Sequence, residues 1–189
     1  MRIIGGRWRG RRLRVAAAPG LRPSADRVRE TLFNWLAGVL PGAHCLDLFA
    51  GSGALAFEAV SRGAARAVLV ERHPRVARRL AEEIAAFDPA ALELWRGSAL
   101  DYLRQPPPAR PFDIVFIDPP FASDLLAGAL ARLAATPGWL HPASRLYLEF
   151  PQATPPALPA GWNWLRRQQA GAVGYGLVRL TAQAEEAPP

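Results

Sequence analysis

The stretch at residues 46–53 constrains the fold more than any other part of the chain. It is an apolar run that ends in two glycines, and an apolar periodic segment at 54–60 follows it directly. This order is typical of a buried strand, a tight turn and a helix. Gly51 and Gly53 let the backbone of the turn approach a ligand closely, because glycine has no Cβ. The helix that follows directs its free N–H groups at the same ligand.

Two classes of nucleotide-like ligand suit this turn. Gly51, Gly53 and Ala56 form the pattern Gly-x-Gly-x-x-Ala, which also accommodates the pyrophosphate of a dinucleotide. Asp47 favours the other class, since a carboxylate at the strand end repels a pyrophosphate and attracts a cation. S-adenosylmethionine carries a sulfonium and an ammonium group and has no phosphate. We therefore expect a methyl-donor site here rather than a nicotinamide or flavin site.

Strand-like and helix-like segments alternate along the chain. Strands are expected over residues 45–49, 67–70, 92–95, 113–117, 145–149, 162–168 and 173–180. Helices are expected over 54–62, 74–87, 98–103 and 123–135. Gly171 and Gly174 lie around the turn between the last two strands, which predicts an antiparallel hairpin. The alternation predicts an α/β, Rossmann-like fold with a doubly wound, mainly parallel sheet of seven strands.

Positive charge is concentrated at the N-terminus. Residues 1–30 contain nine arginines and two acids, so the net charge of +7 of the whole chain lies in this segment. A basic segment beside a neutral domain predicts a polyanionic partner, and nucleic acid is the class that we expect. A solvated basic arm without a partner is the alternative.

The charge divides the chain into three parts. Residues 1–40 are expected to be a basic, RNA-facing extension, 41–182 the domain that holds the cofactor, and 183–189 a disordered tail. In the extension, residues 1–4 and 11–15 are expected to form a hairpin. A helix is then expected from about Ser24, as its N-cap, to about residue 37.

Trp8 lies between Arg7 and Arg9 in the turn of that hairpin. It suits two roles, either stacking on a base while its neighbours hold phosphates or filling the space under the hairpin. The sequence leaves both open. The candidate RNA contacts are Arg7, Trp8, Arg9, Arg11, Arg12, Arg22, Arg27 and Arg29.

The most specific motif is Asp118-Pro119-Pro120-Phe121, which directly follows the strand at 113–117. Ligands of a doubly wound sheet bind beyond the carboxyl ends of its strands. Two prolines fix the backbone and remove two donors, so the loop presents the Pro119 carbonyl and the Asp118 carboxylate as a pair of acceptors. Such a pair suits an exocyclic amine, and Phe121 can stack on the base that carries it. Orientation of the amine then favours methyl transfer, with Asp118 placed to accept the released proton.

Glu71 closes the second strand of the alternating pattern, 18 residues after Gly53. That is near the distance at which an acid meets the ribose hydroxyls of a nucleoside ligand, although a surface glutamate is the alternative. The residues assigned to the cofactor at the first two strand ends are Asp47, Phe49, Gly51, Gly53, Glu71 and Arg72.

Several other classes of protein are disfavoured. His44, His73 and His141 are scattered and form no metal-ligand cluster. The single cysteine, Cys45, excludes an internal disulfide and fits a reducing compartment. The basic N-terminus has no apolar core after it, and no uncharged run is long enough to span a bilayer. We therefore expect a cytoplasmic monomer without metal or membrane.

These motifs together resemble the RsmD-type 16S ribosomal RNA guanine-N2 methyltransferases. The residues that carry the resemblance are 2–6, 9–11, 22–24, 26–36, 46–55, 118–121 and 170–171 with Tyr175. The resemblance implies S-adenosylmethionine as the methyl donor, a guanine of 16S rRNA as the target and the assembled small subunit as the substrate. It also adds Ser98 and Ala99 to the cofactor residues. Ser98 is a departure, because many related enzymes have Asp or Asn there facing the adenine amine.

Three other functions remain open from the motifs alone. An adenine-N6 methyltransferase on RNA or DNA uses the same kind of loop but usually carries an added recognition domain. A protein-glutamine methyltransferase presents a carboxamide to such a loop but needs no basic arm. An RNA-binding assembly factor without catalysis has no need of Asp47, Glu71 and Asp118, all of which are present.

Overall fold

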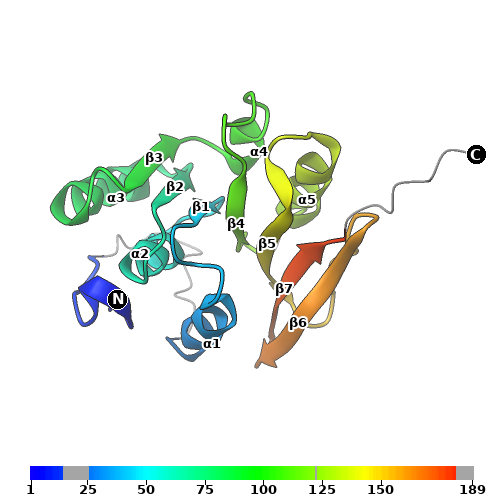
Figure 1. The fold of residues 1–189 in the computed structure, drawn as a ribbon, viewed down its shortest axis with the longest axis horizontal. Coiled ribbons are helices and arrows are strands. Elements are labelled where there is room, and N and C mark those ends of the chain that lie inside the picture. Colours follow the sequence, from blue (N-terminus) through cyan, green and yellow to red (C-terminus); the bar gives the residue numbers. More distant parts are fainter. Residues whose placement is uncertain (15–25, 122, 182–189) are drawn as a thin grey trace, which may run out of the picture.

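A computed structural model describes residues 1–14, 26–121 and 123–181 of the 189-residue chain. Its centre is a sheet of seven strands in the order β3-β2-β1-β4-β5-β7-β6 (Figure 1). The strands are β1 (His44–Asp47), β2 (Arg66–Glu71), β3 (Leu92–Arg96), β4 (Phe112–Ile117), β5 (Leu140–Pro151), β6 (Trp162–Ala170) and β7 (Val173–Leu180). The helices are η1 (Gly6–Trp8, a 3-10 helix), α1 (Asp26–Leu36), α2 (Ala54–Ser61), α3 (Pro74–Phe87), α4 (Ala99–Tyr102) and α5 (Leu125–Ala135).

The sheet is mixed. β1 pairs with β2 and β4, β2 pairs with β3, and β4 pairs with β5, all in parallel. β7 is antiparallel to both β5 and β6. The predicted α/β fold with a mainly parallel, seven-stranded sheet is therefore confirmed, and the predicted C-terminal hairpin supplies its antiparallel part.

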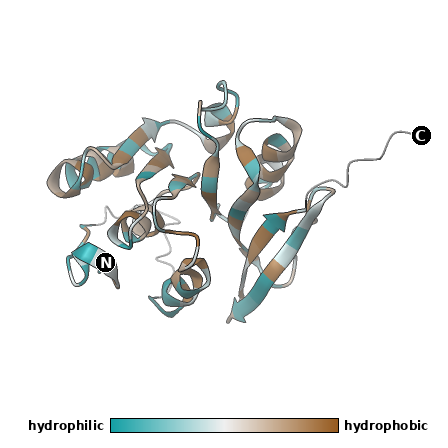
Figure 2. Cartoon of the chain, viewed as in Figure 1, coloured by the Kyte–Doolittle hydropathy of each residue, from teal (hydrophilic) through white to brown (hydrophobic). Residues whose placement is uncertain are grey.

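Two hydrophobic clusters lie on opposite faces of the sheet. One contains the apolar side chains of α1, α2 and α3, and the other those of α4 and α5. The central strands are apolar on both faces because both are covered by helices. Figure 2 shows this hydrophobic centre and the hydrophilic edge strand β6. No helix in the described part of the chain is long and apolar enough to cross a membrane.

The N-terminal segment forms a short version of the expected hairpin. Arg2 and Arg12 form an isolated antiparallel bridge with η1 between them, and the N–H groups of Ile3 and Leu13 donate to the carbonyls of Arg11 and Met1 at 3.0 Å and 2.9 Å. The buried Glu58 carboxylate of α2 accepts the N–H groups of Ile4 and Gly5, both at 2.8 Å, and so connects the hairpin to α2. Residue 15 and the expected N-cap, Ser24, lie outside the described residues.

Candidate active site at the carboxyl edge of the sheet

Four neighbouring strands bring a carboxylate to the same edge of the sheet. Asp47 and Glu71 end β1 and β2, Asp118 directly follows β4, and Glu149 lies near the end of β5. Ile117 pairs with Leu148, so Asp118 and Glu149 lie side by side. Because side chains alternate along a strand, each acid faces the same side as the residue two positions earlier. Those residues all belong to the cluster on the side of α1 and α2: Cys45, Leu69, Phe116 and Tyr147.

Asp47 lies beneath the glycine turn. Its side chain is buried, and its carboxylate accepts hydrogen bonds from the N–H groups of Phe49 and Ala56. The pKa of Asp47 is raised to about 7, mainly by burial, with the Glu71 carboxylate adding to the rise and the two hydrogen bonds opposing it. The carboxyl group therefore shapes the turn from inside, and a cation bound above it would favour its charged form.

Glu71 connects the same turn to the end of β2. Its carboxylate accepts the N–H of Gly51 at 2.9 Å and the N–H of His73 at 2.6 Å. A carboxylate offers about four lone-pair positions, so two hydrogen bonds leave acceptor capacity at a half-exposed group. Glu71 thus ends β2, as predicted, and its carboxylate stabilises the conformation of the turn.

Gly53 is a position in the turn that requires glycine. Its φ of 77° lies in the left-handed region, and a Cβ there would lie 2.9 Å from side-chain atoms of Leu80 and Phe57. Gly53 also forms the N-cap of α2 and provides no side-chain hydrogen bond to the helix. The first turn of α2 therefore directs backbone N–H groups at the edge of the sheet, where a ligand would lie.

The third strand end leads directly into α4, as expected, and Ser98 lies at the start of that helix. The Ser98 hydroxyl donates to the Asp101 carboxylate at 2.6 Å and accepts the Asp101 N–H at 3.2 Å. It therefore acts as the N-cap of α4, which is a local structural role. Ala99 is buried in the first turn of α4, and Arg72 is exposed after β2.

The Asp118–Phe121 loop leaves β4 beside a buried phenol. Asp118 and Phe121 are partly exposed, Pro119 is buried, and the Ser123 hydroxyl donates to the Pro120 carbonyl at 2.6 Å. The Tyr147 hydroxyl donates to Glu149 at 2.7 Å.

Burial raises the pKa of Tyr147 well above its ordinary value, and the Glu149 and Asp118 charges add to that effect. Tyr147 is therefore a neutral donor beside the predicted catalytic loop.

Sequence reasoning did not single out Glu149, although the signal was present. An acid that ends an apolar strand next to the strand of Asp118 must reach the same edge. In the described ranges, no group of three or more His, Cys, Asp or Glu side chains could hold a metal ion.

Trp8 is buried, which favours packing over base stacking, the two roles that the sequence left open. Its side chain is 7% exposed and packs against Phe57 and Phe87, with ring centroids 6.2 Å and 5.1 Å away. The backbone N–H of Trp8 donates to the Ser61 hydroxyl at 2.9 Å. The large apolar ring fills the space between the N-terminal arm (the extension at residues 1–40) and α2. This was the other role that the sequence left open.

Arg29 is fully buried, so its side chain is not exposed for the predicted contact with RNA. Its guanidinium donates to the Arg2 carbonyl at 3.0 Å and to the Asp26 carboxylate at 2.7 Å. The helical spacing could have shown this, because Arg29, Phe33 and Leu36 follow the i, i+4, i+7 pattern of a buried stripe.

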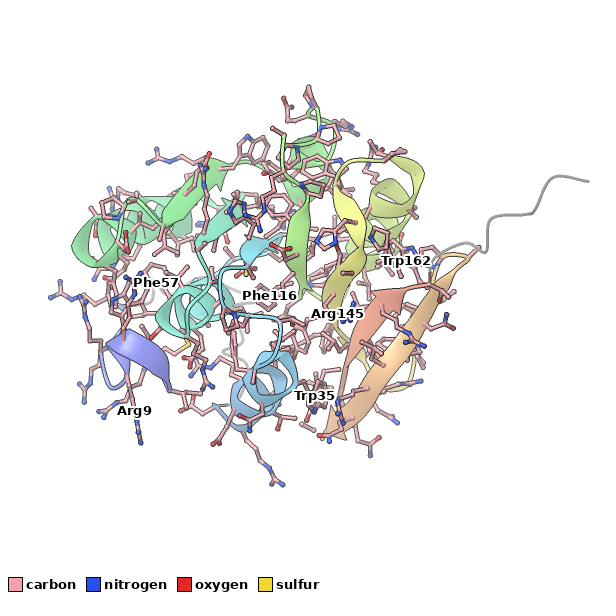
Figure 3. The ribbon with its side chains drawn as sticks, viewed as in Figure 1. Arg9, Trp35, Phe57, Phe116, Arg145 and Trp162 are labelled. Atoms are coloured by element: carbon pink, nitrogen blue, oxygen red, sulfur yellow. The ribbon has the colours of Figure 1, made fainter. Side chains whose placement is uncertain are left out.

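The other predicted RNA contacts that the structure describes are exposed. Arg7 forms an ion pair with Asp88 at 2.6 Å, and Arg11 lies over the Phe87 ring, 3.6 Å from its centroid. The remaining three, Arg9, Arg12 and Arg27, are exposed and form no ion pair with a described residue. Figure 3 shows Arg9 at the periphery of the arm. Arg22 lies outside the described residues.

Comparison with known proteins agrees with this arrangement. The family described as Conserved hypothetical protein 95 matches residues 1–179. Ribosomal RNA small subunit methyltransferase D of Escherichia coli K12 is 45% identical over 98% of this chain and 92% of its own length. The protein of the same description from Haemophilus influenzae is 41% identical over 94% of this chain and 92% of its own length.

A solved structure has the same fold over nearly the whole chain. It is described as the putative methyltransferase yhhF from Escherichia coli, with a TM-score of 0.87 and 45% identity, and the match covers 97% of this chain and 99% of that one. The family match and these two relatives span both the arm and the sheet. The chain therefore belongs to the RsmD-type family of small-subunit ribosomal RNA methyltransferases.

Proposed function

We propose that this protein transfers a methyl group from S-adenosylmethionine to the exocyclic N2 amine of a guanine in 16S rRNA, with the small ribosomal subunit as substrate. The observation that carries the proposal is the position of the Asp118–Phe121 loop, at the same edge of the sheet as the glycine turn. The family relatives are named for action on small-subunit rRNA, and this supports the substrate. Such a substrate belongs in the cytoplasm.

The residues at the turn fit S-adenosylmethionine. Left-handed Gly53 removes the side chain that would fill the space, the Asp47 carboxyl group holds the turn through the N–H groups of Phe49 and Ala56, and Glu71 has acceptor capacity for ribose hydroxyls. When bound, the cofactor supplies a methyl group on a sulfonium. The residues that would hold it are Asp47, Phe49, Gly51, Gly53, Glu71, Arg72, Ser98 and Ala99.

The Asp118–Phe121 loop holds and orients the amine. The Asp118 carboxylate and the Pro119 carbonyl accept its two hydrogens, and Phe121 stacks on the ring of the base. This grip directs the nitrogen lone pair at the methyl donor, and orientation of this kind supplies a large part of the acceleration. Asp118 then accepts the released proton, directly or through water.

The N-terminal arm binds the rRNA backbone. Its exposed arginines carry the charge for phosphate contacts, whereas Trp8 and Arg29 support the fold of the arm. We assign residues 1–40 to this RNA-facing extension and 41–182 to the catalytic domain. The arginines assigned to RNA are Arg7, Arg9, Arg11, Arg12, Arg22 and Arg27.

The test is methyl transfer from labelled S-adenosylmethionine to small subunits purified from a strain that lacks the protein. Asp118→Ala is expected to abolish transfer, whereas Asp124→Ala, which removes an exposed carboxylate after the loop, should retain it. N2-methylguanosine in 16S rRNA is the expected product. N6-methyladenosine would overturn the substrate, and donor binding without transfer to subunits, RNA or DNA would favour a protein substrate or an assembly factor.

A further inference from the structure

The second concentration of uncompensated charge lies at the other end of the chain. Residues 150–181 contain three arginines and no acid. Two of them, Arg166 and Arg179, share one face of the sheet with Arg145 of β5. We call this surface the hairpin patch, and it consists of Arg145, Asn163, Arg166, Gln168 and Arg179.

The register of the strands shows that these side chains are neighbours. Arg145 lies directly opposite Arg179, and Arg179 lies directly opposite Asn163. Arg166 lies opposite Leu177, one step further along the same face. Directly opposite residues have their side chains on the same face of a sheet, close enough to interact.

This arrangement costs stability. Like charges directly opposite each other destabilise a strand pair. Arg145 donates to the carbonyl oxygens of Ala143 and Ser144, at 2.7 Å and 3.0 Å, and it has no acidic partner among the described residues. Arg166 and Arg179, both exposed, likewise form no ion pair there. The surface is therefore complementary to an anion.

The hairpin patch leads to the catalytic edge. Gln168 lies opposite Tyr175 and accepts its hydroxyl hydrogen at 2.8 Å, and Tyr175 lies opposite Glu149. Glu149 is level with Asp118, as the register of β4 and β5 requires. From Arg145 to Glu149 is four residues of strand, about 13 Å. Tyr147, Leu177 and Tyr175 on this face are buried, so the exposed path from the patch toward the catalytic edge runs along β6, past Gln168.

Other contacts make a protein partner a poorer fit. The two tryptophans of β6, Trp162 and Trp164, lie on the opposite face, where Trp164 packs against Phe150 with ring centroids 5.6 Å apart. The patch itself offers guanidinium and amide groups rather than the apolar anchors of a protein interface. Guanidinium groups bind phosphate oxygens in a bidentate manner.

We propose that the hairpin patch is a second rRNA-binding surface, which holds the phosphate backbone on the side of the catalytic edge opposite the N-terminal arm. Figure 1 shows residues 1–14 and the β6–β7 hairpin on opposite sides of the molecule, with α2 and α1 between them. The inference rests on the proposed function, because it requires an rRNA substrate. It adds a binding surface in a part of the chain for which the sequence analysis found no net charge.

The test variant is Arg166→Gln with Arg179→Gln. Its matched control is Arg78→Gln with Arg132→Gln, which removes the same charge from the outer helices α3 and α5. We expect the patch variant to raise KM for small subunits about tenfold with kcat and donor affinity unchanged. The slope of log kcat/KM against log salt should shrink by about 1 to 2, since each lost phosphate contact contributes about 0.7 to 0.9. Its Tm should stay the same or rise, because the repulsion between Arg145 and Arg179 is removed.

Equal KM and equal salt slopes for the patch and control variants would overturn the inference and leave the proposed function intact. If the wild-type protein transfers no methyl group to subunits, the proposed function fails. Binding of each variant to purified subunits without the methyl donor then decides the inference separately. Ultraviolet cross-links from residues 162–180 to rRNA are expected, and cross-links to a ribosomal protein instead would contradict an RNA surface.

Discussion

The N-terminal arm and the β6–β7 hairpin both carry clustered arginine, but they use it differently. In the arm, Arg29 is buried, Arg7 forms an ion pair with Asp88, and Arg11 covers the Phe87 ring. In the hairpin, Arg166 and Arg179 have no acidic partner in the described part of the chain. The arm has the larger net charge, yet part of it stabilises the fold. Net charge therefore locates a polyanion surface only after the arginines with internal partners are subtracted.

Trp8→Ala should show the largest effect on stability. A small effect would contradict the view that part of the arm serves the fold. The ring is buried against Phe57 and Phe87, so its removal should lower the free energy of unfolding by about 3 to 5 kcal/mol. Thermal or denaturant unfolding measures this, and Trp8→Phe should lose less because it keeps part of the packing. An unchanged stability with weakened RNA binding would return Trp8 to the role of a base-stacking residue.

Arg29→Ala should also act on the fold and not on RNA. It removes the hydrogen bond to the Arg2 carbonyl and leaves a cavity under α1, at a cost of about 2 to 4 kcal/mol. Arg27→Ala, two residues away and exposed, should change stability by less than about 0.5 kcal/mol. Denaturant unfolding of the two variants checks the contrast. Equal stabilities would mean that burial of Arg29 has no energetic consequence.

The free arginines of the arm should act on RNA and not on the fold. Replacing Arg9, Arg12 and Arg27 by Gln should raise KM for small subunits about tenfold or more, and the salt slope should shrink by about 2 to 3. Stability should change little, because these side chains form no ion pair with a described residue. Combining them with the hairpin variants tests whether both surfaces bind one RNA. A triple variant with the KM of the wild type would show that the arm is only a solvated basic segment.

Arg7→Gln should have the smallest effect, and one that depends on pH. Partial burial alone would raise the pKa of Asp88, but the Arg7 guanidinium and the N–H groups of Ala90 and Ala91 hold it below its ordinary value. A carboxyl with a lowered folded-state pKa adds stability above its unfolded pKa and loses it as the pH falls through the folded pKa. The variant should therefore lose less than about 1 kcal/mol at neutral pH. The loss of stability should vanish below the folded-state pKa of Asp88. Thermal unfolding of both proteins over an acid pH series measures this. A loss that stays constant with pH would contradict the ion-pair explanation.

The full length of β5 and the contacts of the arm could not be predicted from the sequence. Residues 145–149 were expected as a strand because only they form an apolar run, but β5 extends from Leu140 to Pro151. The added length comes from pairing with β4 on one side and β7 on the other, and both partners are distant in sequence. In the arm, the buried Glu58 carboxylate accepts the N–H groups of Ile4 and Gly5, which are more than 50 residues away in the sequence. Local propensity cannot anticipate such an acceptor.

The sequence by itself determined the α/β class, the seven strands, the glycine turn and the acceptor loop after β4. These follow from hydrophobic periodicity and from the backbone limits of glycine and proline, which act over a few residues. Only the tertiary structure decided which charged and aromatic side chains are buried, as at Trp8 and Arg29. It also decided the register that places Asp118, Glu149, Tyr175 and Gln168 in one row across four strands. Burial and register are properties of pairs of segments, so they appear only when distant parts of the chain meet.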